Sequence, residues 1–373
     1  EVWTNGGWTR IKRVIRHRTN KKLYRVNTHC GIVTVTEDHS LLDEKINKIK
    51  PGNVKIGETQ LLQDYPNMNK KTPPKLLDIV DVLDKYETYI RTLEEKRAFL
   101  YGMFYGDGSC GFYNCPSGNK YSWAINNTDM RLLELCKSYL VDVYGGKYKI
   151  LDTLKSSGVY KLVACGNVKK FVLDYRSKFY DLECYKCIPD EILNGSYEVR
   201  LQYFIGYYAA DGYKCRRDRT KNICFSNKGK IGSAGLYYLV KSLGYNASIS
   251  MRSDKLNVYR IRCSVGPLRK PKNIIKKIYE LDTVDDYVYD LETEEGIYGA
   301  GIGEIIVKNT DSIFVNFNCH RDGKELKGRE ALEAAIKCGV IIENEIKPLL
   351  KAPHHLEYEK TFWPFILLSK KRY

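Results

Sequence analysis

Two aspartates end the same nine-residue pattern at two places in the chain. Residues 100–108 read LYGMFYGDG and residues 204–212 read FIGYYAADG, so Asp107 and Asp211 lie at matching positions, 211 − 107 = 104 residues apart. The apolar residues have helical spacing, and the small residues between them would let two such helices pack closely. Two carboxylates brought together repel each other unless a cation lies between them, which predicts a Mg²⁺ site.

A second candidate site surrounds Asn309, which precedes Thr310. An asparagine side-chain amide can attack its own carbonyl, forming a succinimide and cutting the chain, and a threonine hydroxyl can accept an acyl group by transesterification. His39 follows a strand-like run at residues 31–36. Its imidazole can protonate a leaving amide nitrogen near neutral pH, although a histidine at a strand end is more often structural.

The elements that must position the aspartates form a faint internal repeat over residues 85–266. Each copy reads as a helix ending at the aspartate, a strand, a second helix and a second strand. In the first copy these last three are residues 123–127, 130–144 and 159–165, and in the second they are 223–227, 236–243 and 258–263. A duplicated unit suits a roughly twofold ligand such as duplex DNA. The alternative is two unrelated α/β segments.

The flanking sequence has a different character. Residues 1–75 read as short strands separated by turns, and the Pro- and Lys-rich stretch 67–75 reads as a linker. Helical patterning is expected from near Leu83 to Tyr105, and an amphipathic helix is expected at residues 328–337.

The length of the chain indicates several domains, and its positive charge indicates a polyanionic partner. The chain has 373 residues, 43% of them hydrophobic, and a net charge of +16. Residues 310–373 hold 11 Lys/Arg and 9 Asp/Glu, a net of 11 − 9 = +2, so +14 lies upstream. Such an excess favours nucleic acid, although a non-enzymatic RNA-binding protein would share it.

The cysteines and the hydropathy pattern indicate a compartment. Twelve cysteines at irregular positions predict free thiols in a reducing, intracellular setting, and Cys184-x-x-Cys187 has neither zinc-site spacing nor a thioredoxin-like context. No apolar run approaches the roughly 18 residues of a membrane span, so no membrane partner is expected.

The duplicated aspartate motifs resemble the LAGLIDADG homing endonucleases, in the single-chain form that carries both motifs. The resemblance implies an α+β fold with an αββαββα repeat over residues 85–266, a monomer, and cleavage of both strands of double-stranded DNA with metal-activated water. It makes Asp107 and Asp211 the metal-binding catalytic acids. Lys186, in the stretch KCIPDE, lies where such endonucleases within inteins carry a lysine that stabilises charge or assists the water.

Three segments outside the repeat resemble conserved blocks of inteins, the elements that excise themselves by protein splicing. Residues 31–42 read GIVTVTEDHSLL and contain the Thr-x-x-His core as Thr36 and His39. Residues 288–293 and 305–310 resemble the last two blocks.

The resemblance implies an all-β Hint splicing domain built from residues 1–80 and 270–309. In it, His39 and Thr36 polarise the upstream junction and Asp290 is the usual acidic partner. Asn309 cyclises, and Thr310 first accepts the upstream segment. No cofactor is implied for splicing.

This sequence departs from the intein pattern at two positions. Lys308 replaces the penultimate histidine, and the histidine expected after Asp290 is absent, where the sequence reads Gly296-Ile-Tyr. A lysine exchanges a proton less readily at neutral pH unless burial lowers its pKa. The block with the initiating Cys or Ser would precede Glu1. We therefore expect cleavage after Asn309 at most, and no complete splicing, from this fragment.

Residues 310–373 resemble the palm of family B DNA polymerases, notably the delta-like members and those of large DNA viruses. The insertion would divide their Tyr-Gly-Asp-Thr-Asp-Ser motif, so that Asp311 is its second aspartate and shares Mg²⁺ with carboxylates upstream of this chain. The closing segment would contact primer–template, through Lys370, Lys371, Arg372 and Tyr373.

The sequence thus predicts a multidomain protein: an all-β splicing domain, an α+β endonuclease and an α+β piece of a polymerase palm. The expected partners are double-stranded DNA and, for the spliced host, deoxynucleoside triphosphates and primer–template. The host compartment would be cytoplasm or nucleus if the source is viral. The rival hypotheses are a stand-alone DNA endonuclease and a basic DNA-binding protein with an inactive nuclease site.

Overall fold

The computed structural model describes most of the chain in several stretches. These are residues 1–39, 41–67, 92–116, 118–211, 213–214, 223–282, 286–309, 315–350, 356, 358 and 360–363. The predicted linker, apart from residue 67, lies outside the described residues. So do Thr310, Asp311 and the basic segment 370–373.

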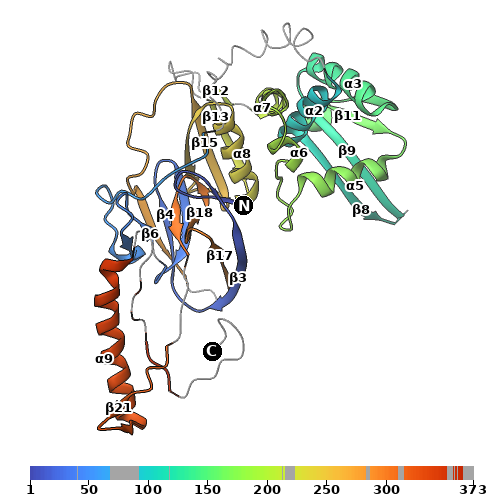
Figure 1. The fold of residues 1–373 in the computed structure, drawn as a ribbon. Helices are drawn as coiled ribbons and strands as arrows, with labels where there is room; N and C mark the ends of the chain where they lie inside the picture. The colour runs from blue at the N-terminus through green and yellow to red at the C-terminus, as the bar shows by residue number, and fades with distance from the viewer. Residues whose placement is uncertain are drawn as a thin grey trace.

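Strands from both ends of residues 1–309 pair with one another in a β-rich unit (Figure 1). We call residues 1–67 and 272–309, as far as they are described, the β unit. Its early elements are β1 (Val2–Trp3), β2 (Trp8–Thr9), β3 (Ile11–Thr19), β4 (Leu23–Asn27), β5 (Gly31–Thr36), β6 (Leu41–Leu42), β7 (Lys48–Ile49) and the 3₁₀ turn Pro51–Asn53. Its late strands are β16 (Lys277–Leu281), β17 (Asp286–Thr293), β18 (Ile297–Gly299), β19 (Ile302–Gly303) and β20 (Ile306–Lys308).

Three sheets each combine early and late strands of this unit. Their orders are β16-β4-β5-β19, β17-β3 and β18-β20-β6-β7, and the pairings are antiparallel. Residues far apart in the sequence therefore share one core, in which Val26, Val33 and Leu41 pack with Ile275 and Ile305.

The second unit is built from two copies of one arrangement. We call residues 92–266, as far as they are described, the repeat unit. The first copy contains α2 (Leu93–Asp107), β8 (Gly108–Cys115), β9 (Gly118–Asn127), α3 (Met130–Tyr144), β10 (Lys147–Thr153), α4 (Leu154–Ser157), β11 (Val159–Cys165) and α5 (Val168–Phe179). The second contains α6 (Asp190–Leu193), α7 (Tyr197–Asp211), β12 (Tyr213–Lys214), β13 (Ile223–Lys228), α8 (Lys230–Ser242), β14 (Asn246–Met251) and β15 (Val258–Ser264).

The two copies have the same sheet topology. The strand orders are β8-β9-β11-β10 and β12-β13-β15-β14, so the first, second, fourth and third strands of each copy lie side by side. A helix that ends in an aspartate precedes each sheet. The repeat unit is thus a duplicated α+β arrangement whose halves meet at α2 and α7.

Three predicted helices have different bounds in the structure. The helix ending at the first aspartate begins at Leu93, where Thr92 has an extended backbone and its side chain accepts a hydrogen bond from the Glu95 amide, and the expected start near Leu83 lies outside the described residues. The other two are longer than expected: α8 begins at Lys230 and α9 spans Gly328–Ile346.

The C-terminal part that the structure describes contains few elements. A short hairpin, β21 (His320–Arg321) and β22 (Lys324–Glu325), precedes α9, and a 3₁₀ turn at Lys347–Leu349 follows it. Among the described residues, no helix has the length and apolarity that a membrane crossing requires.

Candidate functional sites

The helices α2 and α7 are in direct contact through their main chains. A Cβ atom on Gly102 would lie 2.0 Å from the Tyr203 carbonyl oxygen, and one on Gly206 would lie 2.2 Å from the Phe99 carbonyl oxygen. These contacts are reciprocal, because 203 − 99 and 206 − 102 both equal 104, the spacing of the aspartates. Only glycine permits such an approach, and the twofold relation of the two helices follows from it.

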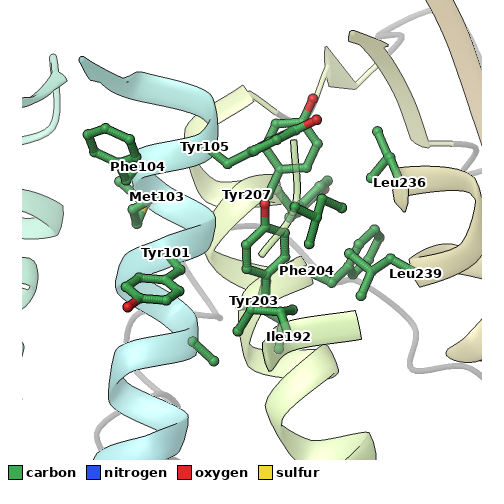
Figure 2. Close-up of a cluster of buried hydrophobic side chains, with 14 of the residues drawn as sticks. Tyr101, Met103, Phe104, Tyr105, Ile192, Tyr203, Phe204, Tyr207, Leu236 and Leu239 are labelled. Atoms are coloured by element: carbon green, nitrogen blue, oxygen red, sulfur yellow. The ribbon is translucent and has the colours of Figure 1, made fainter. Parts of the chain in front are cut away.

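Aromatic side chains fill the space on either side of this helix pair (Figure 2). Tyr101 and Phe104 project from α2, and Tyr203 and Tyr207 project from α7, all almost fully buried. Close packing of these large rings leaves the two helices little freedom to move apart. The interface therefore fixes the ends of the helices, where the aspartates lie.

Asp107 and Asp211 meet at the ends of these helices. A Cβ on Gly106 would be 3.2 Å from the Asp211 Cβ, so the second aspartate packs against the residue before the first. Burial raises the pKa of Asp107 to about 6, with a further rise from the charge of Asp211 and an opposing hydrogen bond from Asn127. In that bond the Asn127 amide donates to Asp107 Oδ2 at 2.6 Å. Burial also raises the pKa of Asp211, against the charge of Lys186.

Lys186 closes the end of α2. Its ammonium group donates to the carbonyl oxygens of Phe104, Tyr105 and Gly108 at 2.8, 2.9 and 2.7 Å. These carbonyls lie at the helix C-terminus, where partners within the helix run out and a cation is favoured. Burial lowers the pKa of Lys186 to about 8, opposed by the negative charges around it. The positive charge of Lys186 therefore acts on both aspartates and opposes the rise in their pKa values, while its N–H groups donate to main-chain oxygens.

This arrangement can hold a divalent cation. Two carboxylates with raised pKa values gain from a cation between them, and Mg²⁺ is usually held by one or two carboxylates together with water and substrate phosphates. Within the described ranges, no cluster of three or more acidic, histidine or cysteine side chains is suited to a metal ion. The two aspartates therefore fit a metal that completes its shell with water and phosphate oxygens.

The second site surrounds Asn309 in the β unit. This residue is 7% exposed, and its main-chain N–H donates to the Gly296 carbonyl at 2.9 Å. Its side-chain Nδ2 is buried and makes no hydrogen bond within the described part of the chain. An amide nitrogen with no such bond is available as a nucleophile. The preceding Lys308 is 9% exposed and pairs with Ile297 in β18.

Asp290 lies near His39 in the same unit. The Tyr298 hydroxyl donates to Asp290 Oδ1 at 2.8 Å, and the Leu291 amide donates to the same oxygen at 2.8 Å. Burial lowers the pKa of His39, although the charges of Asp290 and Asp38 act in the opposite direction. Thr36 ends β5, and its carbonyl accepts the His39 main-chain N–H at 3.0 Å. Residues from two distant regions of the sequence thus meet here.

The first residues of the chain lie beside the same strands. Val2–Trp3 contact β18, and the Trp3 carbonyl oxygen lies 3.4 Å from the Cβ position of Gly299. The Trp3 side chain packs against the core that contains Ile306 in β20. The amino-terminal segment and the strand that leads to Asn309 are therefore neighbours in space.

Sequence reasoning missed several residues of these sites. Asn127 is the hydrogen-bond donor to Asp107, and Tyr298 is the donor to Asp290. The repeat offers a signal for the first, because Asn127 and Asn227 end the matching predicted strands 123–127 and 223–227. Asn227, however, accepts a hydrogen bond from the Tyr105 hydroxyl at 2.9 Å and, within the described part of the chain, makes no hydrogen bond with Asp211. The two copies therefore differ around their aspartates.

A protein family model matches the C-terminal part of the chain. Residues 280–373 match the family model described as DNA polymerase family B. A DNA polymerase of Acanthamoeba polyphaga mimivirus is 47% identical over 382 residues, covering 100% of this chain and 21% of that protein. A DNA polymerase of Thermococcus hydrothermalis is 24% identical and aligns with 98% of this chain and 23% of its own length. The chain thus spans about a fifth of these two relatives.

Other similarities cover part of the chain. The DNA polymerase delta catalytic subunit of Schizosaccharomyces pombe is 30% identical over 106 residues, which are 28% of this chain and 8% of that protein. The solved structure of mesophilic variants of the homing endonuclease I-DmoI aligns with 46% of this chain and 89% of its own, with a TM-score of 0.35 and 18% identity.

Proposed function

We propose that this chain is part of a DNA polymerase precursor interrupted by an intein that carries a DNA endonuclease. The β unit would be the splicing domain and the repeat unit the endonuclease. Residues 310–373 would be the downstream polymerase segment. The observation that carries the proposal is the buried Asn309, with its unpaired amide, at the meeting point of strands from both ends of the β unit.

The similarities support an interruption of this kind. Two relatives named DNA polymerase align with 98% or more of the chain, whereas the delta catalytic subunit aligns with 28% of it. A segment that is present in some polymerases and has no aligned counterpart in another has the distribution of an insertion. In this proposal, Asp311 completes the polymerase metal motif only after the insertion leaves.

We propose the following chemistry at the downstream junction. The Asn309 amide would attack the Asn309 carbonyl carbon, the bond to the Thr310 nitrogen would break, and that nitrogen would leave with a proton. Tyr298 holds the Asp290 carboxylate, whose charge acts on His39. His39 would protonate the leaving nitrogen at the upstream junction, because an imidazole can take up and give away a proton near neutral pH.

Incubation of the purified chain at neutral pH tests the proposed cleavage. Mass spectrometry should detect a peptide that begins at Thr310. Asn309→Ala should abolish its release, whereas Asn53→Ala, at an exposed asparagine of the same unit, should leave it unchanged. Failure of the parent chain to release this peptide would refute the cleavage. In a full precursor that includes the upstream block, the same Asn309→Ala change should block excision of the intein and leave the upstream host segment esterified to the Thr310 hydroxyl.

For the repeat unit we propose site-specific cleavage of double-stranded DNA. Asp107 and Asp211 would hold Mg²⁺, which when bound lowers the pKa of water and neutralises phosphate charge. Lys186 would keep the carboxylates from repelling each other and would add positive charge for a developing phosphate anion. The net charge of +16 favours a phosphate-rich partner, and the single chain supplies both halves of the site as a monomer.

DNA that spans the uninterrupted polymerase motif is the substrate to test. With Mg²⁺, the parent chain should cut both strands, and Asp107→Asn should abolish the cut. Asp254→Asn alters an exposed carboxylate of the same unit and should have no effect. A cut that Asp107→Asn leaves unchanged would exclude the assigned site. No cut by the parent chain would favour the alternative of an inactive DNA-binding unit.

For the spliced host we propose template-directed DNA synthesis, with deoxynucleoside triphosphates and primer–template as partners. Lys370, Lys371, Arg372 and Tyr373 would contact primer–template, and Asp311 would share Mg²⁺ with upstream carboxylates. A viral source, as for the mimivirus relative, would put the protein in the host cytoplasm or nucleus.

A further inference from the structure

Glu304 lies where the β unit meets the second half of the repeat unit. It belongs to the connection between β19 and β20, five residues before Asn309. Ile302, on one side of it, packs in the core of the repeat unit, and Ile305, on the other side, packs in the core of the β unit. The chain passes from one core to the other at this residue.

The Glu304 side chain is buried, and both of its carboxylate oxygens have polar partners. It is 2% exposed. Its Oε1 atom accepts hydrogen bonds from Lys241 Nζ at 3.0 Å and from the Tyr237 hydroxyl at 3.0 Å, both on α8. Its Oε2 atom lies 3.2 Å from Nζ of Lys272, in the β unit. One carboxylate therefore joins both units.

The main chain of Glu304 is fixed as well. Its N–H donates to the Cys30 carbonyl at 2.9 Å, and its carbonyl accepts the Asp64 N–H at 3.0 Å. Gly303 before it has φ +101°, and a Cβ there would be 2.0 Å from the Cys30 oxygen, so the close approach requires glycine. After it, the Ile306 N–H donates to the Leu62 carbonyl at 3.1 Å and begins β20.

A buried carboxylate needs its cationic partners. Burial alone would raise the pKa of Glu304, but the charges of Lys241 and Lys272 outweigh it, and the pKa is lowered. Loss of one lysine leaves an uncompensated charge in a site that excludes water, which is strongly destabilising locally. Lys241 is the better protected of the two, with 23% of its side chain exposed against 52% for Lys272. The repeat unit thus supplies the more buried cation.

We propose that Glu304 is a positioning residue through which the repeat unit holds β20 and Asn309 in place for cleavage. The endonuclease would then be a structural support of the splicing site as well as a separate enzyme. The predicted effect on cleavage depends on the proposed function of the β unit. The positioning itself can be measured without cleavage.

Two lysine substitutions separate charge from packing. Lys241→Met keeps the length of the side chain and removes its charge, whereas Lys241→Arg keeps the charge. Lys230→Met is the matched control, since Lys230 is exposed at the start of the same helix. We expect Lys241→Met to slow release of the peptide beginning at Thr310 by about tenfold, since small misplacements of reacting groups have effects of this order or larger. Lys241→Arg should restore much of the rate, and Lys230→Met should match the parent.

Amide hydrogen exchange of Ile306, Val307 and Lys308 gives the independent measurement. Lys241→Met should speed exchange at these three amides about tenfold or more, with Lys241→Arg and Lys230→Met close to the parent. If the parent releases no peptide, the proposed cleavage fails, and the exchange rates alone decide the role of Glu304. Exchange in Lys241→Met equal to that of the parent would overturn the positioning role. So would a parent-like release rate in a chain that cleaves.

Discussion

Gly102→Ala tests the close approach of α2 and α7 most directly. The new Cβ would lie 2.0 Å from the Tyr203 carbonyl oxygen and 2.6 Å from the Tyr207 main-chain nitrogen. Both are main-chain atoms in a helix, so no side chain can turn aside to make room. Reaching the shortest separation that real Cβ atoms show, 3.0 Å, requires the helices to part by 3.0 − 2.0 = 1.0 Å.

The expected destabilisation follows from two opposing effects. Overpacking of a rigid interface destabilises the folded state by about 3 kcal/mol. Replacing a helical glycine by alanine stabilises the helix by about 1 kcal/mol. The free energy of unfolding should therefore fall by about 2 kcal/mol. A displacement of about 1 Å at the aspartates should also lower any DNA cleavage by about 100-fold. Urea unfolding followed by circular dichroism measures the first effect, and a plasmid-cleavage assay measures the second.

Gly235→Ala is the matched control for this experiment. Gly235 lies in α8, and its nearest atom to a new Cβ would be the Ile188 Cβ at 3.6 Å, an ordinary van der Waals contact. This variant should therefore be more stable than the parent by up to about 1 kcal/mol. If Gly102→Ala were as stable as the parent, the main-chain contact between α2 and α7 would be refuted as the basis of the interface.

Three further results are expected. In metal-free buffer at pH 7, Asp107→Asn should raise the free energy of unfolding by on the order of 2 kcal/mol, because the folded pKa of about 6 exceeds the unfolded 3.8 and stability falls as pH rises between these values. Mg²⁺ should raise the melting temperature of the parent and not of this variant, and an equal rise in both would exclude metal binding there. Lys186→Met should lower the free energy of unfolding by about 2 kcal/mol, because buried carbonyls at the end of α2 lose their donor, and parent-like urea unfolding would contradict this. Tyr298→Phe removes the hydrogen bond to Asp290 and should slow cleavage at the upstream junction of a full precursor about tenfold, whereas Tyr289→Phe, at an exposed position, should not; equal rates by mass spectrometry would exclude a role for the hydroxyl.

The sequence alone was informative about local elements and about which residue types could do chemistry. The run Gly31–Thr36 is a strand and residues 130–144 are a helix, with the predicted bounds, because alternation and helical spacing are local properties. The spacing of 104 residues between Asp107 and Asp211 also predicted a duplicated framework. Element ends were less well predicted, as at Leu93, where a single hydrogen bond from the Glu95 amide to the Thr92 side chain caps the start of the helix.

The tertiary structure decided how these residues act together. Glycine motifs allow a close helix contact, but only the packed core brings Gly102 against Tyr203 and so brings the aspartates together. Lys186 was predicted as a charge near the reaction, and the fold commits its protons to three carbonyls of α2. Glu304 carries no local signal at all. Its partners come from segments that are far apart in the sequence, and long-range burial of charge cannot be read from neighbouring residues.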